Sequence, residues 1–332
     1  MFYKIKQLKS LEDNKYKNLI RDFFFNVYIP RNFNIDDFLF YMGLEGSQFK
    51  GAKYIQNYYD DTKILCIENN PLIYHKFKNK KPDSCELVFG EWKNFIHPYN
   101  LQPDVAFADF CNTPQKTLSV IINDLKNMKQ DSIYATAFSF TRLRLGVKKY
   151  ADKLYNDIGF KKNNYHNNDV YYLIQALVCY IFAKTNIIPE YIIRYQGGSN
   201  PKHPTSMCLM IFKINHNEEK LSDNFLFNDS NIHFYDLFKN YSLLKFKKYI
   251  KKRKKEMKNL QLEKIPSVKK LNQKRAGHKM VRTKLIKKQE SIYVSDISDK
   301  GKIDSLKNIN KKINKKTEII DFLSVKIEKQ FT

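Results

Sequence analysis

Short apolar runs alternate with helix-length stretches over the first half of the chain. Five of these runs resemble buried strands, at residues 38–42, 63–68, 85–89, 105–109 and 132–138. Two of the helix-like stretches between them begin with a proline, Pro71 and Pro114, a residue that suits the first turn of a helix. Strands that alternate with helices in this way predict βαβ units and a parallel sheet.

The pattern changes after the fifth run. A long helical region extends to about residue 184, with a break near residues 159–168. Two more strand-like runs, 190–195 and 206–212, flank a connection rich in glycine and proline, which predicts a hairpin with a long loop. We therefore predict an α/β fold with a mostly parallel, seven-stranded sheet that closes with an antiparallel hairpin.

Three of the apolar runs stop at or just before an acid, namely Glu68, Glu91 and Asp109. Ligands of open α/β sheets lie beyond the carboxyl ends of the strands. A carboxylate there accepts ribose hydroxyls well, because charge-assisted hydrogen bonds are about twice as strong as neutral ones. We expect the three acids to line one edge of the sheet and to hold a nucleoside.

This order of strands and helices, closed by a hairpin, resembles the Rossmann-like fold of class I S-adenosylmethionine-dependent methyltransferases over about residues 36–214. The resemblance implies S-adenosylmethionine as cofactor, with Glu68 on the ribose hydroxyls and the Gly90-Glu91 pair near the adenine. The family's first motif, acid-x-Gly-x-Gly-x-Gly, corresponds here to residues 41–47, where Glu45 would replace the missing acid. The cofactor-binding residues that the resemblance implies are Gly43, Glu45, Gly46, Ser47, Glu68 and Glu91.

The resemblance places the catalytic motif after the fourth strand, at residues 109–114. DNA amino-methyltransferases use Asp/Asn-Pro-Pro-aromatic there to orient the amine of a flipped base. By this likeness Asp109 and Asn112 would accept hydrogen bonds from the amine, and Phe110 would stack on the base. Cys111 leaves cytosine-C5 chemistry open, but the Pro-Cys pair of that family is absent, so base N-methylation is favoured. Alternatively, Asp109 or Asn112 caps the helix that begins at Pro114.

The charge of the chain is strongly positive and unevenly distributed. The net charge is +25, which indicates a polyanionic partner such as DNA or RNA. Residues 245–290 hold 16 Lys and 3 Arg against 3 Glu. This concentration predicts a small basic helical module, in which residues 265–286 resemble a helix-turn-helix. The predicted nucleic-acid-binding residues are Lys251, Lys252, Arg253, Lys254, Lys255, Lys279, Arg282 and Lys284.

Composition divides the chain into a helical lead-in (1–36), a methyltransferase-like domain (37–240), the basic module (241–290) and a polar, partly disordered tail (291–332). The scattered cysteines fit a reducing, cytoplasmic compartment, and the histidines show no metal spacing. No apolar run is long enough to span a membrane. We therefore predict a nucleic-acid methyltransferase. The alternative is a non-catalytic DNA-binding protein of a mobile element on a methyltransferase-like fold, and a structural RNA-binding protein is a third interpretation.

Overall fold

The computed structural model describes residues 14–34, 37–45, 48–59, 61–82, 84–97, 99–110, 112–141, 143, 145–160, 168–197, 205–216 and 232–264, with side chains to residue 257. The chain divides into two compact units, and the first ends at Lys254. In the second unit the described residues are the last turns of one helix.

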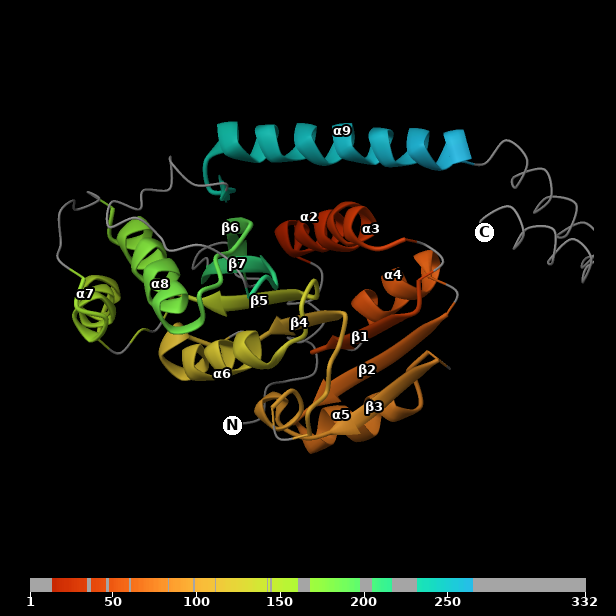
Figure 1. The fold of residues 1–332 in the computed structure, drawn as a ribbon, viewed down its shortest axis with the longest axis horizontal. Helices are drawn as coiled ribbons and strands as arrows, with labels where there is room; N and C mark the ends of the chain where they lie inside the picture. Colours follow the sequence, from red (N-terminus) through yellow and green to blue (C-terminus); the bar gives the residue numbers. More distant parts are fainter. Residues whose placement is uncertain are drawn as a thin grey trace, which may run out of the picture. The chain divides into compact units, whose positions relative to one another are not determined.

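An eight-stranded sheet forms the centre of this unit, in the order β3-β2-β1-β4-β5-β7-β6-β8 (Figure 1). Neighbouring strands are parallel except at β7, which is antiparallel to β5 and β6. The strands are β1 (Leu39–Gly43), β2 (Thr62–Glu68), β3 (Cys85–Phe89), β4 (Val105–Asp109), β5 (Ile133–Ser139), β6 (Tyr191–Gly197), β7 (Thr205–Lys213) and β8 (His233–Asp236).

This topology confirms the predicted Rossmann-like methyltransferase fold, with one correction to the number of strands. The prediction had seven strands, whereas β8 adds an eighth, parallel to β6 at the end of the sheet. The strand has only four residues, His-Phe-Tyr-Asp, and two of them are polar. Such a short run carries too little alternation to be recognised as a strand.

Helices cover both faces of the sheet (Figure 1). In β1, Phe40 and Met42 belong to one apolar cluster, whereas Leu39 and Tyr41 belong to the other. Because both faces are buried, the strands are almost continuously apolar, as in other parallel sheets. The helical elements are α2 (Lys15–Phe23), the π-helix η1 (Phe24–Tyr28), α3 (Ile29–Asn32), α4 (Lys50–Tyr58), α5 (Pro71–Lys78), the 3-10 helix η2 (Trp92–Asn94), α6 (Pro114–Asn127), α7 (Val147–Asp157), α8 (Asp169–Thr185) and α9 (Asn240–Lys264).

The segments before β1 and after β8 pack on the same face of the sheet. The rings of Phe23 in α2 and Phe246 in α9 lie 5.2 Å apart, and both are fully buried. Ile250, one turn further along α9, belongs to the same cluster. The predicted four-part division of the chain stays a prediction, but within the described residues α2 and the first turns of α9 pack on this sheet.

Candidate active site

The carboxyl ends of the parallel strands form an uneven edge. β1 ends at Gly43, level with Cys66 of β2 and Phe107 of β4, and both neighbours continue for two more residues, to Glu68 and Asp109. β1 is also the strand at which the order of the sheet reverses direction, which is where open α/β sheets bind ligands. Neighbouring strands are about 4.8 Å apart, so β2 and β4 end about 10 Å from each other.

Glu68 lies at this edge beside a half-exposed aromatic ring that packs against Tyr74. Its carboxylate accepts a hydrogen bond from the backbone N–H of Asn70 at 2.7 Å, and burial raises the pKa of the carboxyl. Phe89 is its register partner on β3 and is 52% exposed. The N–H of Gly90 donates to the Glu68 carbonyl oxygen at 3.1 Å. A hydrogen-bond acceptor and an exposed ring are therefore adjacent, as a nucleoside requires.

Phe89 is a candidate site residue that the sequence did not reveal. A phenylalanine at the end of an apolar run normally indicates a core residue, and nothing in the sequence shows that its ring is half-exposed. Leu72, in the first turn of α5, is also exposed, at 67%. The end of β3 and the start of α5 therefore leave apolar surface next to the Glu68 carboxylate.

The two residues after Gly90 point in different directions. Glu91 is exposed and forms an ion pair with Lys93 at 2.6 Å. Trp92 is buried in the core, and its indole N–H donates to Oδ2 of Asp124 at 2.7 Å. The Trp92 ring therefore packs in the core and is not available to a ligand at the edge.

Asp124 is a buried carboxyl below this edge. Oδ2 also accepts from the Tyr134 hydroxyl at 2.9 Å, whereas Oδ1 has no hydrogen-bond partner among the described residues. Burial raises the pKa of Asp124 to about 7 despite the two donors. The carboxyl therefore changes charge near neutral pH, inside the core.

Glu45, the acid of the first predicted motif, forms its hydrogen bonds within the fold. Oε1 of Glu45 accepts from the Tyr41 hydroxyl at 2.7 Å and from the Ala52 N–H at 3.1 Å, and Oε2 accepts from the Gly51 N–H at 3.1 Å. Burial raises the pKa of Glu45. The carboxylate thus satisfies amides in the first turn of α4, the place where such a helix would otherwise bind an anion.

The glycines around this carboxylate make room for it. A Cβ at Gly43 would lie 2.3 Å from the Tyr41 hydroxyl oxygen, and one at Gly51 would lie 2.1 Å from Oε1 of Glu45. Gly43 is therefore explained by internal packing. Gly46 and Ser47, the other predicted residues of this motif, lie outside the described residues.

Asp109 forms an ion pair with Lys17, which precedes it by 92 positions in the sequence. Lys17 in α2 places Nζ 2.9 Å from Oδ2, and the two side chains are only 9% and 12% exposed. The sequence did not single out Lys17, although it lies on the same helical face as Ile20 of α2 and Phe24 of η1, at i+3 and i+7. A lysine on such a face was the available signal.

The other residues of the predicted catalytic motif lie close to Asp109. Asn112 is exposed, and its carbonyl oxygen accepts from the Ser139 N–H at 2.7 Å. Phe110 is half-buried, with its ring 6.1 Å from that of Trp92. The expected alternative, in which Asp109 or Asn112 caps α6, is wrong: the N-cap is Thr113, and it makes no side-chain capping hydrogen bond. Cys111 lies outside the described residues.

The cationic run in α9 has two kinds of members. Lys251, Lys252 and Lys255 are exposed. Lys254 forms an ion pair with Asp22 of α2, and the Arg253 guanidinium lies 5.2 Å from the Tyr249 ring. Part of the run therefore attaches α9 to the domain. The predicted helix-turn-helix, with Lys279, Arg282 and Lys284, lies outside the described residues.

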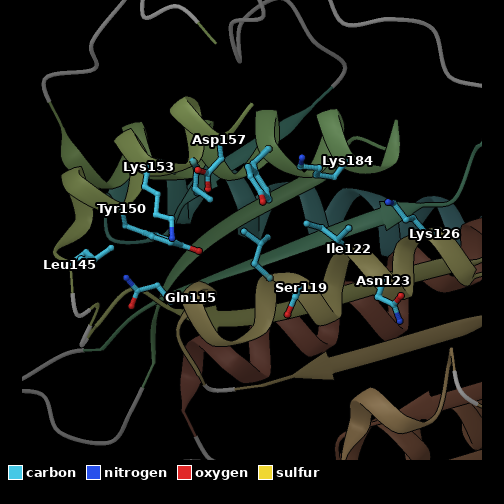
Figure 2. Close-up of a pocket in the computed structure, with 13 residues that line it drawn as sticks. Gln115, Ser119, Ile122, Asn123, Lys126, Leu145, Tyr150, Lys153, Asp157 and Lys184 are labelled. Carbon is cyan, nitrogen blue, oxygen red and sulfur yellow. The ribbon is translucent and has the colours of Figure 1, made fainter. Parts of the chain in front are cut away.

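Two grooves occur away from this edge. One, of about 680 Å³, runs between α6, α7 and α8, and Figure 2 shows Tyr150, Lys153 and Lys184 on its walls. The other, of about 570 Å³, is lined by polar residues such as Tyr28, Glu190 and His233. Glu68 and Asp109 line neither groove, so the candidate site rests on the strand ends and their contacts.

Two features are absent from the described part of the chain. None of its helices combines the length and the apolarity needed to cross a bilayer. Among the same residues, no three His, Cys, Asp or Glu side chains gather as metal ligands would.

The strand order and the antiparallel β7 define the fold as that of class I methyltransferases. No protein-family model matches the sequence, and no curated protein matches it significantly. Solved structures match at low similarity. The Methanococcus jannaschii fibrillarin pre-rRNA processing protein is 12% identical, over 55% of this chain and 70% of its own, with a TM-score of 0.36.

Two other matches have comparable scores. An rRNA methylase from Streptococcus thermophilus is 12% identical, over 61% of this chain and 99% of its own, with a TM-score of 0.35. The plantazolicin methyltransferase BpumL, solved in complex with a triazolic desmethylPZN analogue and SAH, is 12% identical, over 63% of this chain and 89% of its own, with a TM-score of 0.41. At this level the likeness concerns the fold alone.

Proposed function

We propose that this protein is an S-adenosylmethionine-dependent methyltransferase that acts on nucleic acid. The observation that carries the proposal is the position of Glu68 beside the exposed ring of Phe89, at the edge where β1 stops two residues short of β2. An acceptor next to an apolar ring suits the ribose and the base of a nucleoside. The fold supplies the context in which a methyl donor is the nucleoside to expect.

The residues at this edge fit the cofactor on the side of β2 and β3. Glu68 would accept the ribose hydroxyls, and Phe89 with the turn at Gly90 would contact the base. When bound, the cofactor supplies a methyl group activated by a sulfonium. On the side of α4, the Glu45 carboxylate already occupies the helix amides, so the cofactor contacts there must differ from those of the usual glycine-rich loop.

The acceptor would lie on the side of β4. Lys17 fixes the Asp109 carboxylate by their ion pair, and the exposed Asn112 offers an amide oxygen to the amine of a base. Phe110 follows Asp109 directly and would border the base. These residues orient the amine, and positioning of this kind accounts for much of the rate in such a transfer. Base N-methylation is therefore the reaction that we propose.

The charge of the chain supports a polyanionic substrate. The exposed face of α9 carries cations along its whole described length and offers no exposed acid before residue 256; these cations are Lys245, Lys247, Lys248, Lys251, Lys252 and Lys255. Phosphates of DNA or RNA are the natural counterions of such a face.

Titration calorimetry with S-adenosylmethionine tests the cofactor, and transfer of a labelled methyl group to RNA and DNA tests the substrate. We expect saturable binding of S-adenosylmethionine at concentrations below about 1 mM. We also expect the labelled methyl group to appear on nucleic acid in a linkage that is stable to alkali. The absence of binding at about 1 mM, a concentration at which even a ligand of about −4 kcal/mol is half bound, would refute the proposal.

A further inference from the structure

Exposed apolar side chains gather where β8 passes into α9. In the described part of the chain, large hydrophobic residues are exposed at eight positions, and three of these fall between residues 238 and 244. Phe238 is 39% exposed, Tyr241 is 78% exposed and Leu244 is 57% exposed. Tyr241 and Leu244 are one turn apart on α9 and share a face of the helix.

These three residues lie beyond the same edge of the sheet as Asp109. β6 and β8 run parallel to β5, so their carboxyl ends meet the edge at which β4 ends. β8 is four strands away from β4 in the sheet, or about 19 Å. Tyr235 of β8 lies at the same level of the sheet as Asp109 of β4. The register pairs that connect them are Asp109–Ala137, Ala137–Leu209, Leu209–Ile193 and Ile193–Tyr235.

Cations surround these side chains, and the nearest acid is covered. The Arg194 guanidinium lies 4.6 Å from the Phe238 ring, and Lys245 is exposed one turn after Tyr241. Asp236 is 4% exposed, and its carboxylate accepts from Arg194 at 3.2 Å and from the Tyr171 hydroxyl at 2.5 Å. The sequence from 237 to 255 contains no acid. This surface therefore combines apolar rings with positive charge.

We propose that Phe238, Tyr241 and Leu244 form a platform, the α9 platform, on which bases of a single-stranded nucleic acid stack while Lys239 and Lys245 contact its phosphates. Rings interleaved with cations are the usual means of binding single strands. A duplex hides the faces of its bases, so the platform selects single-stranded or looped substrates. This inference rests on the proposed function, which makes nucleic acid the substrate. It adds that the nucleic acid is bound as a single strand or a loop.

Fluorescence anisotropy with the full-length protein tests the platform. The probes are a labelled single-stranded RNA, its DNA equivalent and the corresponding duplexes. We expect Tyr241→Ala and Phe238→Ala each to weaken single-strand binding about tenfold. The dependence of affinity on salt should not change, because no charge is removed. Tyr241 is so exposed that its truncation should leave the melting temperature unchanged.

Two controls separate stacking from other contributions. Tyr99→Ala removes a ring that is 67% exposed elsewhere on the domain, and it should bind all probes like the wild type. Lys251→Gln with Lys252→Gln should weaken single strands and duplexes alike, and it should lower the salt slope by about one unit for each phosphate that the protein no longer neutralises.

The platform is refuted if Tyr241→Ala and Phe238→Ala bind single strands like the wild type, or if they weaken duplex binding equally. Measurements of methyl transfer test the proposed enzyme separately from the platform. Loss of single-strand binding in these variants, in a protein that transfers no methyl group, would support the platform and refute the proposed function. Methyl transfer with an unchanged KM in both variants would refute the platform alone. If the wild type bound no nucleic acid, both proposals would fail.

Discussion

Glu45 lies just after β1 and Glu68 is the last residue of the neighbouring β2, yet their carboxylates have opposite surroundings. Glu45 accepts hydrogen bonds from Tyr41, Gly51 and Ala52, all within the β1–α4 segment. Glu68 accepts from the turn that follows it and is partly buried, next to the half-exposed Phe89. Both acids were expected to bind the cofactor, and only Glu68 has the surroundings of a ligand-binding group.

The difference shows that an acid at a strand end has two uses. Two more acids are turned inward to partners in the fold, as Glu45 is: Asp109 at the end of β4, held by Lys17, and Asp124 in the helix α6, held by Trp92 and Tyr134. Burial without partners would cost these acids several kcal/mol, so their partners are part of the fold. Substitutions among the inward acids and their partners should change stability, whereas substitution of Glu68 should change ligand affinity.

Lys17→Met should have the largest effect. It removes the cation that Asp109 faces in a nearly buried pair and should lower the free energy of unfolding by about 4 kcal/mol. Urea denaturation measures the loss. The double variant Lys17→Met/Asp109→Asn should recover part of it, because the carboxylate charge is removed too. An unchanged midpoint in Lys17→Met would show that the pair does not stabilise the fold.

The next largest effect is the pH dependence that Asp124 contributes. Its folded-state pKa, about 7, lies above the unfolded value of 3.8, so the folded protein keeps a proton that the unfolded chain has released. This contribution is greatest at low pH and is lost as the pH rises toward 7, by about 1.4 kcal/mol per pH unit. Asp124→Asn keeps an acceptor for Trp92 and Tyr134 without the charge.

Denaturation of both proteins between about pH 5 and pH 7 tests this assignment. The variant should gain up to about 3 kcal/mol relative to the wild type over that interval. Parallel stability curves for the two proteins would contradict a titration of Asp124 in this range.

Glu45→Gln should lower the free energy of unfolding by about 2 kcal/mol, because the NH2 group that replaces one carboxylate oxygen can no longer accept from a donor of this segment. The matched control is Glu86→Gln on β3, where the side chain is exposed, and it should have little effect. Chemical denaturation at constant pH compares the two. Equal stabilities would place the Glu45 carboxylate in solvent and remove the contrast with Glu68.

The hydrophobic pattern predicted most of the sheet. The ranges 85–89 and 105–109 are those of β3 and β4, and the helices that begin at Pro71 and Pro114 are α5 and α6. The two strands are nearly continuous apolar runs, and each of the two helices begins with a proline in its first turn. β8 was missed because four residues carry little pattern. The packing of α2 and α9 on one face could not be predicted, because it depends on long-range contacts such as that between Phe23 and Phe246.

The candidate site was predictable only in outline. Parallel strands place their carboxyl ends together, so a common edge for Glu68, Glu91 and Asp109 followed from the order of elements. Which acid faces inward depends on its partners. Lys17 lies far from Asp109 in sequence, and Tyr41 reaches Glu45 only because Gly43 and Gly51 leave space. Exposure of the Phe89 ring likewise depends on how few side chains cover it.

Glu68→Ala should be the smallest change to the fold and the most informative about the ligand. The affinity for S-adenosylmethionine should fall about tenfold, equivalent to about 1.4 kcal/mol, as a charge-assisted pair of hydrogen bonds is lost. Because the carboxylate is only partly buried and bonds nearby amides alone, the melting temperature should change little. Titration calorimetry measures the affinity. Glu91→Ala, which removes an exposed acid two residues beyond Phe89, is the control.

The control also decides between two ways in which this edge could bind a nucleoside. If Glu91→Ala weakens binding as much as Glu68→Ala does, the edge acts through its general negative charge, since the Glu91 carboxylate already pairs with Lys93 in solvent. An effect confined to Glu68, and matched by Phe89→Ala, indicates direct contact with ribose and base. A Glu68→Ala protein that is destabilised but keeps full affinity would place Glu68 with the inward acids and contradict the distinction between the two groups.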